Sequence, residues 1–431
     1  MIRLYDFDNV KPEEILNRDI RAEADVEATV DAIIADVRAR GDAALIEYAA
    51  KFDHAELQSV QVTQQEIDEA FAELEAQDPE FITTLKMAAE NIRHFHEQQL
   101  HKNFVLTDQP GVVLGQKYTP IQRAGVYVPG GTAAYPSTVL MDVIPAKVAG
   151  VKEIVMTTPA GAGGKVNAAI LAAAVIAGID KIFKTGGAQA VAALAYGTES
   201  VPAVDKIVGP CNIYVATAKR KVFGKVGIDM IAGPSEILVL ADGGCNAAWV
   251  AADLLSQAEH DRLATAVLVT DSMELDKAVQ AELETQIPAL PRAAIARESI
   301  DVNGKIVVTD SLEKAIEAVN LIAPEHLEIC TADPFALLGR IKNAGSIFLG
   351  RHVPEALGDY FAGPNHTLPT SGTARFSSPL GVDDFVKKSS FIYYTPEALG
   401  AVKDRIADFA EREGLHAHAR SVTIRYDKDA E

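Results

Sequence analysis

A glutamine and a histidine three residues apart are the first residues whose types and spacing allow chemistry. Gln257 and His260 stand at the end of a helical segment, residues 254–261, and their separation places both side chains on one face. An amide oxygen and an imidazole nitrogen can both bind Zn²⁺, although glutamine is an uncommon ligand. A polar helix end with a capping histidine explains the pair more simply. The spacing alone leaves both interpretations open.

Two adjacent groups that can transfer protons follow a proline. Pro324 favours an extended turn before a short strand, and neighbouring side chains of an extended chain point apart. Glu325 and His326 are therefore expected to serve two separate proton transfers. Histidine suits the removal of an alcohol proton near neutral pH, and a carboxylate of raised pKa can activate water. The alternative is a turn that only exposes two polar side chains.

Two further segments carry carboxylates and imidazoles. Asp359 and His366 belong to a loop rich in glycine and proline, and loops on a rigid scaffold often carry function. Near the C-terminus, Glu413 is followed closely by His416 and His418. A third group, His94, His96 and His101, lies in or just after a charged helix without a carboxylate-bearing loop. We expect that group to form a solvent-exposed face.

Three glycine-containing turns follow predicted strands, at residues 127–131, 186–189 and 209–212. In an open parallel sheet, ligands bind beyond the carboxyl ends of the strands, where small residues let a nucleotide approach the backbone. The turn at 161–164 resembles a phosphate-binding loop, but its spacing fails. The third glycine of a dinucleotide fingerprint would fall at Val166, and no Ser or Thr follows Lys165. This last turn is interpreted as architecture.

The elements that must position these residues alternate between short apolar runs and alanine-rich helical stretches. This βα alternation is typical of parallel sheets covered by helices on both faces, and it predicts two similar α/β units. Strands are expected at 125–129, 153–158, 181–184, 206–208, 236–241, 265–270, 305–309 and 346–349. Helices are expected at 26–40, 82–99, 137–148, 166–177, 188–195, 247–260 and 272–284. Residues 1–22 look like a detached leader, and the tail after residue 381 is charged and helical.

Composition narrows the possible partners. The 431 residues are 48% hydrophobic and 23% charged, which is ordinary for a globular protein of two or more domains. The net charge of −20 argues against nucleic acid and anionic membranes as partners and suits a small cationic substrate. The three cysteines form neither a disulfide framework nor a thiolate zinc site. Since no targeting segment or membrane-spanning run is recognisable, the protein is expected in the cytoplasm.

Taken together, the motifs resemble the histidinol dehydrogenase family, and the similarity spans nearly the whole chain. The segments that carry it are RAGVYVPGG at 123–131, GGAQA at 186–190, AGPSE at 232–236, DLLSQAEH at 253–260, PEHL at 324–327, NAGSIFLG at 343–350, the stretch 358–370 and EGLHAH at 413–418. Their order and spacing leave little room for another family.

The resemblance implies a reaction and its cofactors. L-Histidinol would be oxidised to L-histidinaldehyde and then to L-histidine, the last step of histidine biosynthesis, while two NAD⁺ are reduced in succession. The residues that match the family's zinc ligands are Gln257, His260, Asp359 and His418. His326 matches the general base, and Glu325 matches the residue that activates water for the aldehyde step.

The resemblance also implies the binding residues. Residues matching the substrate pocket are Ser235, Gln257, His260, His326, Asp359, His366, Glu413 and His418. Residues matching the NAD contacts are Tyr127, Gln189 and Asn212. One departure is Cys211, where the family more usually has glycine, so the approach of the backbone to the nucleotide can differ there.

The implied fold is α/β, with two incomplete Rossmann-like parallel-sheet domains and small terminal helical elements in an intertwined homodimer. The expected domains are an N-terminal arm at 1–22, a metal-binding and catalytic domain from 23–126 and 235–380, an NAD-binding domain at 127–234 and a dimerisation tail at 381–431. In such a dimer, His418 would be supplied to the site of the partner subunit.

Two other classes of protein are alternatives. The first is a metal-dependent hydrolase or aldolase on a similar α/β scaffold, which would form no NADH. The second is a non-catalytic metal-binding protein with the same fold, but such a protein is expected to lack Glu325 or His326, and both are present.

Overall fold

The computed structural model describes residues 2–10, 24–130, 134–179 and 181–427. The chain forms two compact units. The first contains residues 1–99 and 121–385, and the second contains residues 100–120 and 386–431. Two parallel sheets lie in the first unit, and each is the centre of what we call a lobe.

The six-stranded lobe is built on a fully parallel sheet with strand order β1-β11-β10-β9-β12-β13. Its strands are β1 (Arg3–Asp6), β9 (Glu236–Ala241), β10 (Thr265–Thr270), β11 (Lys305–Val308), β12 (His326–Cys330) and β13 (Ser346–Leu349). Alternate residues of β9 face opposite sides: Ile237 and Val239 pack into one core cluster, and Leu238 and Leu240 into another. The sheet is therefore buried on both faces, as the apolar runs predict.

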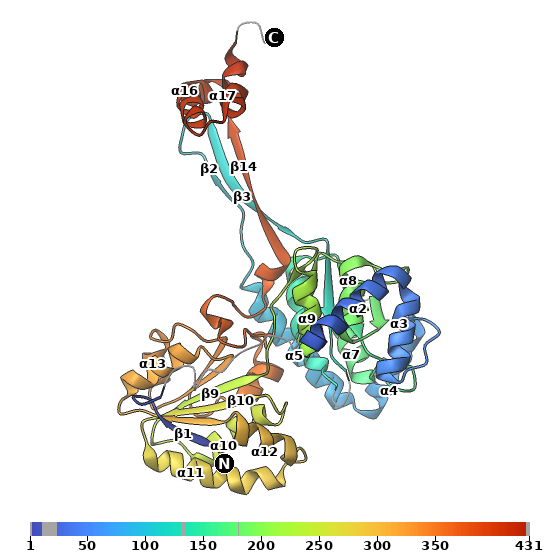
Figure 1. Cartoon of the computed structure of the whole chain (residues 1–431), viewed down its shortest axis with the longest axis vertical. Helices are drawn as coiled ribbons and strands as arrows, with labels where there is room; N and C mark the ends of the chain where they lie inside the picture. Colours follow the sequence, from blue (N-terminus) through green and yellow to red (C-terminus); the bar gives the residue numbers. More distant parts are fainter. Residues whose placement is uncertain (1, 11–23, 131–133, 180, 428–431) are drawn as a thin grey trace. The chain divides into compact units, whose positions relative to one another are not determined.

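Helices cover both faces of this sheet. Helices α10 (Ala247–Ala258), α11 (Met273–Gln286) and α12 (Ala293–Val302) pack on one face, and α13 (Leu312–Ile322) packs on the other (Figure 1). Shorter elements complete the lobe: α14 (Pro334–Leu338), α15 (Glu355–Leu357), the π-helix η3 (Gly358–Ala362) and the 3₁₀ turns η2 (Ile287–Ala289) and η4 (Thr373–Arg375). A further 3₁₀ turn, η5 (Val382–Phe385), contacts helix α6 (Pro136–Ala149) of the other lobe.

The five-stranded lobe has a second parallel sheet with strand order β6-β5-β4-β7-β8. Its strands are β4 (Arg123–Tyr127), β5 (Glu153–Thr158), β6 (Lys181–Lys184), β7 (Lys206–Val208) and β8 (Gly227–Ile228). The helices between them are α6 (Pro136–Ala149), α7 (Ala168–Ala177), α8 (Gly187–Tyr196) and α9 (Ile213–Val222). The predicted α/β class with two parallel sheets is confirmed.

Helices ahead of the first sheet strand of this lobe pack on it. They are α2 (Ala24–Arg40), α3 (Asp42–Tyr48), the π-helix η1 (Ala49–Asp53), α4 (Gln64–Gln77) and α5 (Pro79–Glu97). Helix α2 contacts α8 and α9, α4 contacts α7, and α5 contacts α6. This differs from the expected grouping of residues 23–126 with 235–380. An amphipathic helix shows in its sequence that one face is buried, but not which sheet it covers.

Two local expectations also differ from the structure. Residues 3–6 are not part of a detached leader, because they form β1 and pair in parallel with β11; residues 11–22 of the expected arm lie outside the described residues. His96 is not on a solvent-exposed face. It is fully buried, and its Nδ1 lies 2.7 Å from the Ile92 main-chain oxygen, whereas His94 is exposed.

The second unit is a three-stranded antiparallel sheet with two helices. Its elements are β2 (Phe104–Leu106), β3 (Val112–Pro120), β14 (Val386–Tyr394), α16 (Pro396–Arg412), α17 (His416–Thr423) and the 3₁₀ turn η6 (Ile424–Tyr426). The tail thus begins with a strand that the sequence did not predict. Most of β14 is exposed, so it lacks the apolar pattern of a half-buried strand, and its partner β3 lies far away in the sequence.

None of the helices in the described part of the chain is both long enough and apolar enough to cross a membrane.

Candidate active site

The predicted proton-transfer residues lie at the amino end of strand β12, beside the amino end of its partner β9. His326 is the first residue of β12, and Ser235 immediately precedes β9. Helix α10 connects β9 to the parallel strand β10 and returns the chain to the amino ends of the strands, so that Gln257 reaches His326. Most open parallel sheets bind ligands at the opposite end, beyond the carboxyl ends of the strands. The residues that the sequence motifs single out therefore lie at the end of the sheet that this general rule does not favour.

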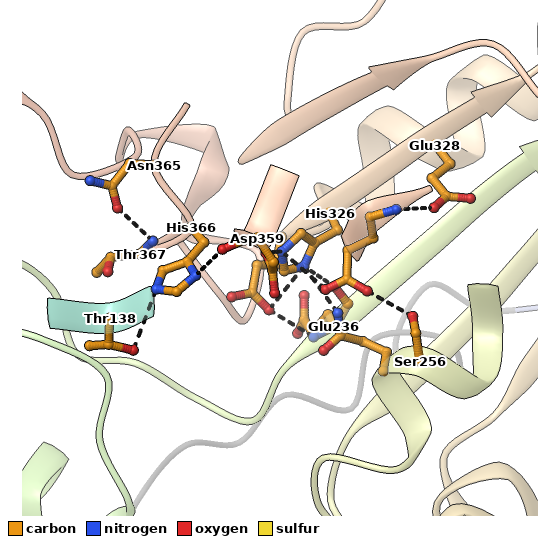
Figure 2. A network of polar contacts seen from close by, with 12 residues as sticks. Thr138, Glu236, Ser256, His326, Glu328, Asp359, Asn365, His366 and Thr367 are labelled. Carbon is orange, nitrogen blue, oxygen red and sulfur yellow. Dashed lines mark hydrogen bonds and ion pairs between the residues drawn. The ribbon is translucent and has the colours of Figure 1, made fainter. Parts of the chain in front are cut away.

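The imidazole of His326 is held in one orientation. The residue is 4% exposed, and its Nδ1 lies 3.0 Å from the main-chain oxygen of Glu236 and 3.4 Å from the Gln257 side-chain nitrogen. An Nδ1–H that donates to the Glu236 oxygen leaves the lone pair on Nε2. Nε2 lies 3.5 Å from a carboxylate oxygen of Asp359 (Figure 2) and 3.8 Å from one of Glu355.

The charge around His326 favours its protonated form. Burial lowers the pKa of the imidazole, but the carboxylates of Glu325, Asp359 and Glu355 outweigh burial and raise this pKa to about 10. A positive ion bound beside these carboxylates would offset their charge and bring the pKa back toward neutral, where a histidine is an effective base.

Glu325 lies closer to His326 than its sequence predicts. Its carboxylate accepts a 2.8 Å hydrogen bond from the Glu236 main-chain N–H and is 3.6 Å from His326 Nδ1. The expectation that the two side chains point apart is therefore wrong. The reason is the bend before them, where Ala323 has a left-handed φ of 48° and both side chains turn toward the same residue of β9. Burial raises the pKa of Glu325 to about 8.

Three carboxylates that were not among the predicted site residues extend this site. Glu355 is 3% exposed, accepts a 2.7 Å bond from the Ser256 hydroxyl and donates its main-chain N–H to Glu328 at 2.8 Å. Burial raises the pKa of Glu355 to about 7 and that of Glu328 to about 9, the latter also because of the nearby charge of Asp253. No spacing rule marks these residues, although Glu355 precedes Asp359 by one helical turn.

The site has the donors for a divalent cation. Ligand atoms of His326, Glu355 and Asp359 lie within 4.8 Å of one another. Burial tends to raise the pKa of Asp359, but its bond to His326 and nearby positive charge hold it at about 2, so this carboxylate is ionised. The amide of buried Gln257 is beside the same imidazole. Nitrogen and oxygen donors gathered in one partly buried place suit Zn²⁺.

The two other predicted histidines of the first unit flank Asp359. His260, half-buried just beyond α10, has its pKa lowered by burial, while the Asp359 charge acts in the opposite direction. The Nδ1 of His366 lies 3.1 Å from the Asp359 main-chain oxygen, and its Nε2 lies 3.4 Å from the hydroxyl of Thr138 on α6 (Figure 2). His366 thus joins the six-stranded lobe to the five-stranded lobe.

Buried bonds strengthen this connection between the lobes. The Thr367 hydroxyl donates to the carboxylate of Asp142 at 2.7 Å, and the Asn365 amide donates to the Met141 main-chain oxygen at 2.6 Å. Asp142 is fully buried, and burial raises its pKa to about 8. The loop that carries His366 is therefore anchored on helix α6.

The predicted NAD contacts lie at the carboxyl ends of strands in the five-stranded lobe. Tyr127 ends β4, and its hydroxyl accepts a 3.3 Å bond from the N–H of Gly187, the first residue of α8. Gln189, also on α8, is buried. Asn212 is exposed and caps α9, accepting bonds from two main-chain N–H groups of the first turn. The predicted turn at 161–164 is confirmed, and Gly131 lies outside the described residues.

A buried ion pair forms hydrogen bonds with the turn that follows β7. Lys219 donates to the main-chain oxygen of Gly209 at 2.9 Å, and Asp229 accepts from the Gly209 N–H at 2.8 Å. The two side chains also pair with each other, with 0% and 1% of their surface exposed. Gly209 has a φ of 124°, and a side chain there would collide with the Tyr127 main-chain oxygen.

Comparison with known proteins identifies the family. A model of the histidinol dehydrogenase family matches residues 16–426. The chain belongs to the histidinol dehydrogenase family. Histidinol dehydrogenase of Clostridium acetobutylicum is 55% identical over 96% of this chain and 95% of its own, and that of Geobacter sulfurreducens is 56% identical over 95% and 96%. The crystal structure of histidinol dehydrogenase from Elizabethkingia anophelis has a TM-score of 0.93 at 39% identity, covering 99% of this chain and 98% of that one.

Membership of the histidinol dehydrogenase family confirms the resemblance and the predicted class, an NAD-linked oxidoreductase. The hydrolase or aldolase alternative has no support. The structure brings six of the predicted residues together near the amino ends of β9 and β12: Gln257, His260, Glu325, His326, Asp359 and His366. Glu413 and His418 belong to the second unit, where both are exposed.

Proposed function

We propose that this chain oxidises L-histidinol to L-histidine by way of L-histidinaldehyde, with the reduction of two NAD⁺. The observation that carries the proposal is the fixed orientation of His326, whose Nδ1 is held by Glu236 while Nε2 faces the carboxylates of the site. Together with the family match over residues 16–426, this gives a positioned base in an NAD-linked enzyme.

Two residues would move the protons. In the first oxidation, Nε2 of His326 removes the hydroxyl proton as hydride leaves the adjacent carbon, and an aldehyde results. In the second, Glu325 removes a proton from water, whose oxygen adds to the aldehyde before the second hydride leaves. The hydride would pass to bound NAD⁺ in each step. The raised pKa of Glu325 suits a base that works near neutral pH.

Zinc would be held by Gln257, His260, Asp359 and His418 of the partner subunit. It would bind the imidazole and amine of the substrate and fix the alcohol carbon in place. Ser235, His366 and Glu413 would complete the substrate pocket, and Tyr127, Gln189 and Asn212 would bind NAD. Support comes from the donors around Asp359 and from the cluster of carboxylates, which a cation would neutralise.

The proposed assembly is an intertwined homodimer in which each tail completes the site of the other subunit. The supporting observation is that Glu413 and His418 belong to a unit separate from the catalytic lobes and are exposed there. We also place the enzyme in the cytoplasm, where NAD⁺ is available and where its three free thiols remain reduced.

The direct test is the yield of NADH when zinc-loaded protein is mixed with limiting L-histidinol and excess NAD⁺. We expect two NADH per histidinol. Because Nε2 of His326 is the base, His326→Asn should lower kcat by a factor of about 10²–10⁴. Chelation of the metal should abolish the reaction and should be reversed by added zinc.

His94→Asn is a matched control, because it removes an imidazole that is exposed and distant from the site in sequence. Its activity should equal that of the wild type. Absence of NADH from folded, zinc-bound wild-type protein would overturn the proposed reaction, and normal activity of His326→Asn would overturn the assignment of the base.

A further inference from the structure

A segment before helix α4 wraps around the carboxyl end of the five-stranded sheet. Ala49, Ala55 and Leu57 form a buried cluster with Ala160, which lies in the turn after β5. The chain then runs along the edge strand β6, where the Val62 N–H donates to the Ile182 oxygen at 2.9 Å. The segment 49–62 is therefore attached to the lobe along its edge strand β6 and at the carboxyl end of the sheet, the end where Tyr127 and Gly187 lie.

Asp53 is the residue of this segment that has no structural explanation. It ends the π-helix η1, and the next residue, His54, has a left-handed φ of 54°. One carboxylate oxygen of Asp53 is buried and has no hydrogen-bond partner among the described residues. A buried acceptor without a donor is costly, and in native structures it often marks a place where a ligand supplies the donor.

The segment that carries Asp53 lies beside the predicted nucleotide turns. Ala55 packs against Ala160. The preceding Pro159 lies next to Gly130 and Gly186 of two of these turns. Burial raises the pKa of the Tyr127 phenol, and the charges of Cys211 and Asp53 raise it further, in keeping with this placement. Burial raises the pKa of Asp53 itself to about 6, so that it is mainly ionised at neutral pH. The Tyr127 hydroxyl accepts from Gly187 at the start of α8. Asp53, Tyr127 and Gly187 thus belong to one corner of the lobe.

We propose that Asp53 accepts a hydrogen bond from the 2′-hydroxyl of the adenosine ribose of NAD⁺ and thereby selects NAD⁺ over NADP⁺. The proposal rests on the proposed function, because it takes the ligand of this corner to be NAD⁺. A ribose hydroxyl is the donor that the buried oxygen lacks, and a carboxylate repels the 2′-phosphate that distinguishes NADP⁺. The role comes from a π-helix outside the sheet, in a lobe without a dinucleotide fingerprint.

The test compares Asp53→Ala and Asp53→Asn with Glu56→Gln, which removes an exposed carboxylate from the same segment. For Asp53→Ala we expect the KM for NAD⁺ to rise about tenfold and the ratio of kcat/KM for NADP⁺ over NAD⁺ to rise at least as much. The KM for histidinol should stay unchanged. Asp53→Asn should lose the discrimination against NADP⁺, and Glu56→Gln should match the wild type.

Fluorescence titration of NADH and NADPH without histidinol separates this proposal from the proposed function. Wild-type protein that binds NADH but does not oxidise histidinol would overturn the function alone, and the titration of the variants would still decide the role of Asp53. Unchanged NADH affinity and unchanged discrimination in folded Asp53→Ala would overturn the role of Asp53. Loss of histidinol affinity equal to the loss of NADH affinity would also overturn it, because that pattern indicates a general structural defect.

Discussion

At the scale of single residues, one peptide unit orients both proton-transfer groups. The N–H of Glu236 donates to Glu325, and its main-chain oxygen accepts from His326. Because Glu236 begins strand β9, these two contacts are as rigid as the sheet itself. A main-chain anchor cannot be removed by a side-chain substitution, so the orientation of the two groups depends on the register between β9 and β12.

The pKa of Glu325 predicts how the aldehyde step depends on pH. The carboxylate must be ionised to take a proton from water, and burial raises its pKa to about 8. The rate of NADH formation from L-histidinaldehyde should therefore rise as the pH increases from 6 through 8. Glu325→Gln cannot accept this proton, so the rate should fall by a factor of about 10²–10⁴ and the rise near pH 8 should disappear.

Glu274→Gln, an exposed carboxylate at the start of α11, is the matched control and should keep the wild-type pH profile. A Glu325→Gln protein that retains both the rate and the rise near pH 8 would assign water activation to another group.

At the scale of elements, the β7–α9 turn depends on the buried pair of Lys219 and Asp229. Lys219 comes from α9 and Asp229 follows β8, and together they bind both the N–H and the oxygen of Gly209. The first residue of the turn between Gly209 and Asn212 is therefore held through both of its main-chain polar groups. We infer that the pair positions the turn for NAD.

Lys219→Met should destabilise the protein, because it leaves the carboxylate of Asp229 buried without its positive partner. We expect a loss of about 3–5 kcal/mol in the free energy of unfolding. Lys219→Met/Asp229→Leu removes both charges and should recover much of that loss. It should still raise the KM for NAD⁺ about tenfold, because Gly209 keeps neither contact. Denaturant unfolding and steady-state kinetics measure the two effects.

Lys225→Met is the control, since Lys225 is exposed in the same segment. A double variant with normal stability and a normal KM for NAD⁺ would show that the ion pair has no part in positioning the turn.

At the scale of the whole molecule, the second unit has little core of its own. Its core cluster among the described residues consists of Ala407, Ala410 and Ala419. Large apolar side chains remain exposed on it, including Ile392 at 75% and Phe409 at 68%. Exposed apolar surface of this kind is typical of a region that another chain covers. This supports the proposed dimer, in which the tail is shared between subunits.

Mixing two inactive variants tests whether His418 is supplied by the partner. In a heterodimer of His326→Asn and His418→Asn chains, tail exchange produces one site with both natural histidines and one with neither. Random reassociation of equal amounts should therefore restore about a quarter of wild-type activity. If each tail serves its own chain, the same mixture should stay inactive.

Mixing two wild-type preparations that carry different affinity tags, and isolating the dimers that carry both tags, controls for the efficiency of subunit exchange. An inactive mixture of the two variants, under conditions where this control shows exchange, would contradict a shared site.

The sequence by itself determined the parallel α/β architecture and the family. Fully apolar runs such as β9 and β10 have to be buried on both faces, and the intervening helices identify the sheets as parallel, because these patterns are local. The motifs around Gln257, His326 and Asp359 indicated the family, and the structure brings these side chains together. Residue types and their order carry this information without any knowledge of long-range contacts.

Only the tertiary structure decided which elements meet. The pairing of Arg3–Asp6 with β11, the β3–β14 ribbon and the packing of α2–α5 on the five-stranded lobe join segments that are distant in sequence. For the same reason, the burial of Glu355 beside His326 and the position of Asp53 near the predicted nucleotide turns were not predictable. In each case the fold brings one carboxylate, which belongs to no sequence motif, next to a partner from another element. The local periodicity of the sequence contains no information about such a contact.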